Sequence, residues 1–260
     1  AALIERPDVD VVVELIGGTG AAKKFILQAL RLGKPVVTAN KKLLAEYGEE
    51  IHRTAEAHNT EILFEASVGG GIPIIKALRE GLCANRIESI YGILNGTCNY
   101  ILTRMENEKL PFDEVLKAAQ AAGYAEAEPS LDIDGHDTAH KAAVLASLAY
   151  GCNVPLAKVQ VAGIRGLAAA DIAYAAEMGY RIKLLAIIRG GAEGVEVSVQ
   201  PTLVEHGHQL AAVSGVFNAV LVKGDVVGTT LYYGRGAGRA ATASAVVADL
   251  ADAALNLRAG

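Results

Sequence analysis

The sequence predicts an α/β region, half of a doubly wound parallel sheet, followed by an α+β region with a mixed sheet covered by helices. Two observations carry this prediction. Apolar β-branched runs alternate with helical segments over residues 9–66, and later strands come in pairs joined by short turns. The 260 residues and 52% hydrophobic content are enough for a substantial core in one large or two small domains.

The first region follows the order strand, helix, strand, helix, strand. Its first apolar run ends in Gly17-Gly18, which is typical of a buried parallel strand that meets a tight turn, and Asn40 is placed to cap a helix. The expected elements are a strand at 9–16, a helix at 19–31, a strand at 36–38, a helix at 41–58 and a strand at 61–66.

Ligands of such sheets bind past the carboxyl ends of the strands. Those ends are Gly17-Gly18, residues 38–41 and residues 67–71, and the glycines at 69–71 precede a helix whose N-terminus suits an anion. Simple chain reversal is the alternative for each glycine turn. No G-x-G-x-x-G pattern follows a first strand, so we expect the first strand–helix unit of a dinucleotide-binding fold to be missing from these 260 residues.

From residue 72 the pattern changes to helices and paired strands. The expected elements are helices at 74–81, 112–122, 137–151 and 170–178, strands at 86–94, 160–164, 181–189, 195–203, 217–223 and 228–233, and a last helix ending near 257. Residues 95–99 are expected as a turn and helix start. Alternating glycines at 234–238 predict a second anion cradle, with a flexible connector as the alternative.

The central stretch joins an acidic loop to the helix at 137–151. On that helix Lys141 shares its face with apolar residues at 144, 145 and 148, so it points toward a core, and Asp137 lies one turn earlier on the same face. A partly buried Asp–Lys pair beside an acidic loop suits a small cationic or zwitterionic substrate held next to a proton donor. A purely structural ion pair is the alternative.

Charge and composition weigh against several classes of protein. The three cysteines are scattered without a C-x-x-C, which predicts reduced thiols in a cytoplasmic protein and no zinc site. A net charge of −5 argues against a nucleic-acid partner, and we expect no membrane span and no signal peptide. The aspartates at 132–137 are superficially like a calcium loop, but Ala143 stands where the bidentate Glu is required.

Five segments carry a resemblance to a known family. They are TANKK (38–42), EASVGGGIP (65–73), ILNGTCNYIL (93–102), GYAEAEPSLDIDGHDTAHK (123–141) and YYGRGAGRAATASAVV (232–247). In this order they resemble homoserine dehydrogenases over nearly the whole chain, and the fourth segment is the family's signature. Glu128 departs from the shorter polar residue that is more usual before the proline.

The resemblance implies reversible, NAD(P)H-dependent reduction of L-aspartate 4-semialdehyde to L-homoserine, a step toward threonine, methionine and isoleucine. Matched by position, Lys141 is the expected general acid/base, mostly protonated in the reductive direction, and Lys41 is the family's other functional lysine. Glu126 and Asp137 are expected to hold the amino end of the substrate. The cofactor, NADP or NAD, is expected to contact Gly17, Thr38, Lys41, Gly123, Gly236 and Gly238.

The resemblance also implies a cation and an assembly. Main-chain oxygens of Glu65, Val68, Gly70 and Ile72 are expected to bind a monovalent cation, usually sodium. A homodimer is expected through the sheet of the second domain. The predicted domains are a partial Rossmann-type NAD(P)-binding domain at 1–71, a substrate-binding and dimerisation domain at 72–233, and a glycine loop and helix at 234–260 that pack back on the first. The alternative is a catalytically incomplete fragment that acts only as a small-molecule-binding module.

Overall fold

The computed structural model describes residues 2–259, and its first sheet is three-stranded and parallel. Its order is β1 (Val12–Glu14), β2 (Val36–Thr38) and β3 (Ile62–Leu63), connected by helices α1 (Ala21–Arg31) and α2 (Lys41–Ala57). The predicted alternation of strands and helices is therefore confirmed. Asn40 caps α2 as expected, because its side chain accepts a hydrogen bond from the Leu43 amide at 3.1 Å.

A six-stranded mixed sheet forms the second half of the fold. Its strands are β4 (Ile87–Ile93), β5 (Gln160–Val161), β6 (Tyr180–Gly191), β7 (Gly194–Glu205), β8 (Phe217–Gly224) and β9 (Gly228–Arg235). Their order is β5-β7-β6-β4-β8-β9, and only β5 and β7 pair in parallel. The antiparallel pairing of β8 with β9, expected from their short connection, is confirmed.

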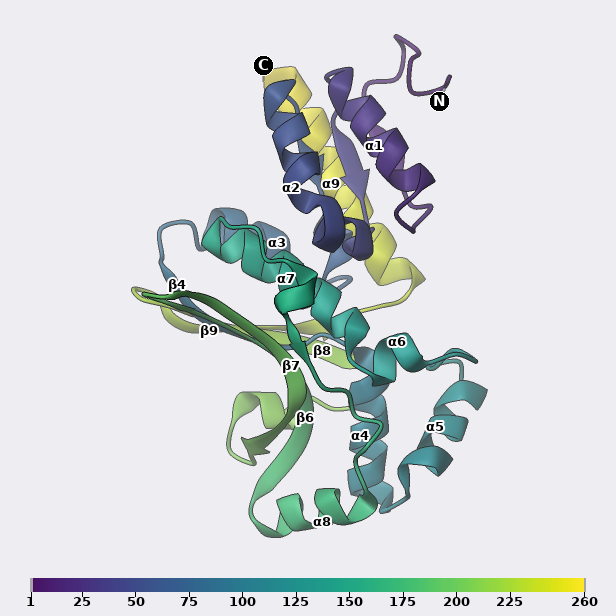
Figure 1. Cartoon of the computed structure of the whole chain (residues 1–260), viewed down its shortest axis with the longest axis vertical. Helices are drawn as coiled ribbons and strands as arrows, with labels where there is room; N and C mark the ends of the chain where they lie inside the picture. Colours follow the sequence, from purple (N-terminus) through teal and green to yellow (C-terminus); the bar gives the residue numbers. More distant parts are fainter. Residues whose placement is uncertain (1, 260) are drawn as a thin grey trace.

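Helices pack on this sheet and join it to the first one. They are α3 (Ile74–Lys76), η2 (Ala77–Gly81), α4 (Gly96–Glu108), α5 (Phe112–Ala121), α6 (Ser130–Ile133), α7 (His136–Tyr150), η3 (Leu156–Lys158), α8 (Ala169–Glu177) and η4 (Gln209–Ala212). Helix α7 packs on β6 and β7 with one side and on α2 with another. It therefore lies between the two halves of the molecule, as Figure 1 shows.

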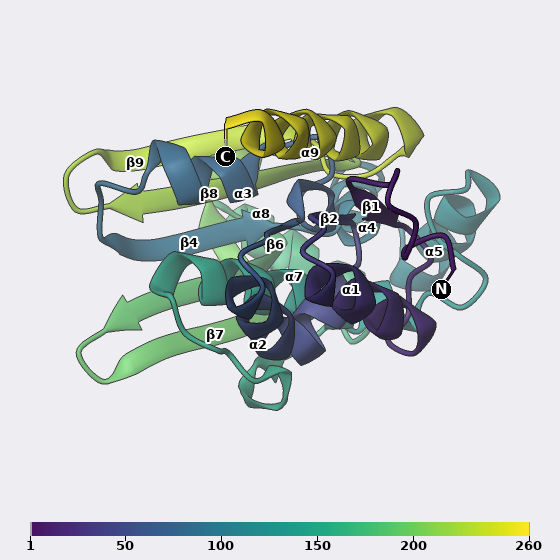
Figure 2. The ribbon, with the colours of Figure 1, turned by 90° about the horizontal axis from the view of Figure 1, so that it is seen from above.

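The last helix, α9 (Arg239–Ala259), returns to the three-stranded sheet. Val37 and Leu63 pack against Ala245 and Val246 of α9, whereas the neighbouring Val36 packs on the side of α1 and α2. Strand β2 is consequently covered on both faces, with α9 on one side and α1 and α2 on the other (Figure 2).

Helix α9 also bears on the expectation that no membrane span is present. Within the described residues it is the one helix that is long and apolar enough, by length and composition alone, to cross a membrane. Its hydropathy comes from alanine, valine and leucine residues dispersed along the helix rather than from one continuous apolar run. Two of its carboxylates bond to the rest of the protein: Asp249 to the Glu65 amide at 2.8 Å and Asp252 to the Lys76 ammonium at 2.7 Å. These bonds make α9 a packed element of this fold.

Four local predictions were wrong. The strand expected at 160–164 spans only Gln160–Val161. The first strand spans only 12–14 rather than 9–16, and the strand expected at 61–66 stops at Leu63 and continues as a 3₁₀ turn, η1 (Glu65–Ser67). The turn forms because the Glu65 carboxylate leaves the strand direction to accept two main-chain N–H bonds from the start of α3. The acidic loop contains a short helix, α6, that the carboxylates and Pro129 did not suggest.

Candidate active site

Two lysines from different halves of the fold bracket one buried carboxylate. Asp137, in the first turn of α7, is 4% exposed. Lys141 Nζ donates to its Oδ2 at 2.6 Å and also to the Leu94 carbonyl oxygen at 2.7 Å. Lys41 Nζ, from the first residue of α2, lies 3.1 Å from Asp137 Oδ1. The predicted Asp–Lys pair is therefore present, and a second lysine joins it from helix α2, which packs beside the three-stranded sheet.

Asn95 ties a second carboxylate to this cluster. Its Nδ2 donates to Asp132 Oδ1 at 2.7 Å and to Asp137 Oδ2 at 2.9 Å. Its Oδ1 accepts from the Cys98 amide at 2.8 Å and so caps α4. Sequence analysis assigned neither Asn95 nor Asp132 to the site. The N-cap pattern was visible, but the partners lie about 40 residues away and only the fold brings them together.

The surroundings shift the pKa values of the two carboxylates in opposite directions. Burial raises the pKa of Asp137, but the charges of Lys141 and Lys41 and the hydrogen bonds from Lys141 and Asn95 outweigh it, so the pKa lies well below the usual range. For Asp132, burial and the charge of Asp137 raise the pKa, and the hydrogen bond from Asn95 opposes them only in part. Asp137 is thus firmly anionic, and Asp132 is the carboxylate closer to accepting a proton.

A second polar group lies at the carboxyl ends of β1 and β2. The Glu14 carboxylate is 2% exposed and accepts from the amides of Ile16 at 2.7 Å and Gly17 at 2.9 Å. It also accepts from the buried Thr38 hydroxyl at 2.8 Å. Asn40 Nδ2 donates to the Gly18 carbonyl oxygen at 2.7 Å. Sequence analysis included Glu14 only as a strand residue, although an acidic residue at the end of a buried strand was a signal.

The glycine turn at this edge leaves room for a ligand. Gly17 and Gly18 have φ of +78° and +72°, a region that favours glycine, and no atom lies within 4 Å of where a Cβ would stand. Their main chain is therefore open to close approach, as a phosphate- or ribose-bearing cofactor requires.

The glycine segment 69–71 does not leave a free anion site at the helix that follows it. The N–H groups of Ile75 and Lys76 are already bonded to the Glu65 carboxylate, at 2.9 and 2.8 Å. The anion at this helix start is thus a residue of the chain itself. A Cβ on Gly70 would lie 2.5 Å from the Gly236 carbonyl, so the two glycine loops pack directly on each other.

The remaining predicted residues lie on loops outside the charged cluster. Glu126 and Gly123 are exposed on the loop between α5 and α6, and the Glu126 carboxylate forms no hydrogen bond or ion pair with any described residue. Thr97 Oγ1 donates to the Tyr124 carbonyl oxygen at 2.8 Å, which ties this loop to α4. Gly236 is buried and Gly238 has φ of +111°. The cation-binding role of the main-chain oxygens at 65, 68, 70 and 72 stays a prediction.

The aspartates at 132–137 are not arranged as the ligands of a calcium loop. Asp134 turns away from Asp132 and Asp137 to bond Arg165 at 2.8 and 2.9 Å. Among residues 2–259, no group of three or more His, Cys, Asp or Glu side chains is arranged to hold a metal ion.

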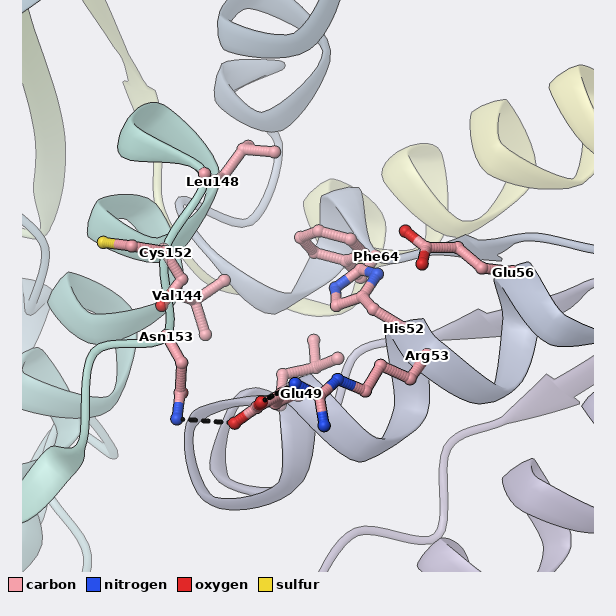
Figure 3. Close-up of a pocket in the computed structure, with 13 residues that line it drawn as sticks. Glu49, His52, Arg53, Glu56, Phe64, Val144, Leu148, Cys152 and Asn153 are labelled. Atoms are coloured by element: carbon pink, nitrogen blue, oxygen red, sulfur yellow. Dashed lines mark hydrogen bonds and ion pairs between the residues drawn. The ribbon is translucent and has the colours of Figure 1, made fainter.

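A cavity of about 470 Å³ lies between α2 and the C-terminal half of α7 (Figure 3). The His52 ring meets Phe64 edge-on at 5.7 Å there, and Asn153 donates to Glu49 at 3.0 Å. Its lining among the described residues includes none of the predicted site residues, although the same two helices carry Lys41 and Asp137. The charged cluster, rather than this cavity, is the candidate active site.

Two family models match the chain in sequence. One, described as "Homoserine dehydrogenase, NAD binding domain", matches residues 1–65, and one described as "Homoserine dehydrogenase" matches residues 73–251. The chain belongs to the homoserine dehydrogenase family. The resemblance and the fold class stated from the sequence are confirmed.

Similar proteins include the homoserine dehydrogenase of Neisseria gonorrhoeae, 57% identical over 252 residues, or 97% of this chain and 58% of the relative. That of Bacillus subtilis is 49% identical over 258 residues, or 99% of this chain and 60% of the relative. A solved homoserine dehydrogenase from Thiobacillus denitrificans has a TM-score of 0.94 and 54% identity, over 96% of this chain and 58% of that one. The chain thus spans about three-fifths of the length of these relatives.

A hyperthermophilic archaeal homoserine dehydrogenase solved in complex with NADPH matches with a TM-score of 0.85 and 31% identity, over 98% of this chain and 74% of that one. The NAD-binding family match contains the ends of β1 and β2. A nucleotide-binding region of the homoserine dehydrogenase family is therefore present, and the residues that contact the cofactor stay predictions.

Proposed function

We propose that this chain carries the catalytic centre of a homoserine dehydrogenase, which reduces L-aspartate 4-semialdehyde to L-homoserine with NAD(P)H and reverses the reaction. The observation that supports this most strongly is Asp137 held between Lys141 at 2.6 Å and Lys41 at 3.1 Å, where a residue of the nucleotide-binding region meets the mixed sheet. A purely structural pair does not need a second lysine that is 35% exposed.

The chemistry divides between cofactor and protein. When bound, the nicotinamide supplies hydride to the aldehyde carbon, and the oxygen then needs a proton. Lys141 is the proposed donor, because its ammonium is nearly buried and is fixed by Asp137 and the Leu94 carbonyl oxygen. In the oxidative direction the same amine takes the proton back. Lys41 adds positive charge beside the oxygen on which negative charge develops.

The proposed place for the cofactor is the edge formed by the carboxyl ends of β1 and β2. The open main chain at Gly17 and the Lys41 side chain lie at this edge, Thr38 is buried there with its hydroxyl donated to Glu14, and the loops that contain Gly123 and Gly236–Gly238 are the proposed remaining contacts. The proposed cofactor is NADP or NAD.

The substrate's amino end is the proposed partner of the acidic groups. Glu126 has a free carboxylate on the loop above the cluster, whereas both oxygens of Asp137 already hold lysines. We therefore assign Glu126 the direct contact and Asp137 the shaping of the local field. The same proposal includes a sodium ion at main-chain oxygens of residues 65–72 and a homodimer formed through the six-stranded sheet. It also includes a cytoplasmic location and domain boundaries at residues 71 and 233.

The test is NADPH-dependent reduction of aspartate semialdehyde by this chain and by a version extended at its N-terminus. Lys141→Ala in the active version should lower turnover by roughly 10²–10⁴, the size of a lost general acid, with cofactor affinity little changed. Lys117→Ala, on the exposed face of α5, is the matched control and should keep normal turnover. Near-normal turnover of Lys141→Ala would remove that residue from the mechanism.

The alternative is a binding module without catalysis. It predicts that cofactor titration succeeds with this chain while both the chain and its extended version stay inactive. Activity in only the extended version supports the enzyme and identifies these 260 residues as an incomplete part of it.

A further inference from the structure

Asn95 occupies the junction between β4 and α4 and makes three hydrogen bonds with one side chain. It is 5% exposed. Its oxygen accepts from the Cys98 amide, and its two amide hydrogens go to different carboxylates, Asp132 and Asp137, at 2.7 and 2.9 Å. The residue just before it, Leu94, gives its carbonyl oxygen to Lys141. Two consecutive residues therefore hold both members of the Asp–Lys pair.

The orientation of the amide is determined by its partners. If the Asn95 amide were flipped, its oxygen would face two carboxylates and its NH₂ group would face the N–H of Cys98. Every one of the three hydrogen bonds would be lost. The assignment with both donors on the carboxylates is the only one that satisfies all the groups.

The two carboxylates differ in how their charge is balanced. Asp137 has two lysines within 3.1 Å, whereas Asp132 has no cationic side chain within ion-pair distance among the described residues. The Asn95 amide makes the largest favourable contribution to the charged form of Asp132, ahead of the Lys141 charge and Thr97. Without that donor, burial and the charge of Asp137 are less opposed, so Asp132 takes a proton more easily, and Asp137 Oδ2 loses one of its two donors.

We propose that Asn95 is a positioning residue that keeps Asp132 ionised and reserves Asp137 for Lys141, and so sets the acidic limit of the pH range in which the site works. The kinetic part of this proposal rests on the proposed function; the ionisation part does not.

Other titratable groups lie near this cluster and must be considered in the test. They are Lys41 from α2, Cys98 from α4, Asp134 at the end of α6, and His140 and Lys141 from α7. Of these, Lys41 and Lys141 bond Asp137 rather than Asp132, and Asp134 is bonded to Arg165. Asn95 is the group whose removal acts on Asp132 most directly.

The decisive variant is Asn95→Ser. Serine is a good N-cap, so α4 keeps its cap while both amide donors are lost. In carbon-13 NMR of aspartate-labelled protein, with the signal assigned through Asp132→Asn, the titration midpoint of Asp132 should rise by roughly one to two pH units, the value of one charge-assisted hydrogen bond. Turnover should fall by about ten- to a hundred-fold at acidic pH and recover toward higher pH, with KM little changed.

Asn85→Ser is the matched control. Asn85 also accepts a main-chain N–H bond, from Val227 at 2.9 Å, but its amide donates only to the Leu82 carbonyl oxygen. This variant should move neither the midpoint nor the pH profile. An unchanged Asp132 midpoint in Asn95→Ser would overturn the proposal, and so would a loss of turnover that is the same at every pH.

A double variant keeps the test valid if Asn95→Ser fails to fold. Adding Asp132→Asn removes the second carboxylate, so the Asn95→Ser/Asp132→Asn protein should fold and show no acidic shift. If the double variant also fails to fold, the Asn95 amide is needed for the fold itself rather than for the ionisation of Asp132, and the proposal is wrong. If the parent protein and all variants are inactive but Asn95→Ser still raises the titration midpoint of Asp132, the proposed function is wrong. The proposed effect of Asn95 on the ionisation of Asp132 would then still hold.

Discussion

Replacing Asp137 by Asn should destabilise the protein strongly, because it leaves the Lys141 ammonium in the interior without its countercharge. The side chain of Lys141 is 12% exposed, and its remaining described partner is the Leu94 carbonyl oxygen. At about 4 Å between charge centres and an effective dielectric constant of about 20, the lost attraction is about 4 kcal/mol. Breaking a buried pair by removing one partner costs about 3–5 kcal/mol, which agrees.

Thermal unfolding followed by circular dichroism measures this loss. For a chain of this size, about 4 kcal/mol corresponds to a fall in Tm on the order of 10 °C. The comparison should include Asp137→Asn/Lys141→Met, in which the buried charge is removed along with its partner. That double variant should recover most of the lost stability, since replacing a buried pair by neutral groups is often close to neutral.

The pH dependence gives a second check on the same reasoning. The pKa of Asp137 in the folded protein lies below its unfolded value, because the lysine charges outweigh the effect of burial. The stabilisation from this carboxylate is therefore fully present above about pH 4 and is lost as the pH falls toward the folded pKa. A Tm for Asp137→Asn within 1–2 °C of the parent at neutral pH, or a double variant less stable than either single one, would refute the argument.

Two further predictions concern stability away from the cluster. Burial lowers the pKa of Lys183 to about 8. The free energy of unfolding should therefore rise between about pH 8 and 10.5, and this gain is lost as the pH falls through 8. Denaturant titrations at several pH values should show that Lys183→Met abolishes the rise. Gly70→Ala should cost about 1–3 kcal/mol of unfolding free energy, because the new Cβ would stand 2.5 Å from Gly236 at a φ of +55°. Gly20→Ala has open space around the new Cβ and should cost far less. Equal effects of the two substitutions would contradict this account.

The parts of the site that could be predicted from the sequence are those fixed by local spacing. The Asp137–Lys141 pair follows from the i,i+4 geometry of one helix, and the caps at Asn40 and Asn95 follow from residue type beside a helix start. The partners of Asn95 could not be predicted, because they come from a loop whose path depends on how α6 and α7 pack. Family resemblance supplied the role of Lys41, and the fold supplied its contact with Asp137.

The wrong element boundaries have the same physical origin. An alternation of apolar residues predicts a strand through residue 66, but Glu65 has stronger partners than a strand can offer it. Its carboxylate accepts the free N–H groups at the start of α3, and its own amide is bonded by Asp249 from the far end of the chain. A partner 184 residues away is invisible to any local pattern.

The two lysines differ in what holds them, and this difference has a mechanistic consequence. Lys141, Asp137 and the Leu94–Asn95 junction all belong to helices and strands of the mixed-sheet half, so their contacts persist if the two halves move. Lys41 belongs to α2, and its contact with Asp137 at 3.1 Å crosses between the halves. A rotation of the nucleotide-binding half would break the Lys41 contact first and leave the Lys141 contacts in place. If Lys141 is the proton donor, as proposed, the groups that hold the donor therefore lie in one half alone, whereas the second positive charge beside Asp137 depends on the packing of the two halves.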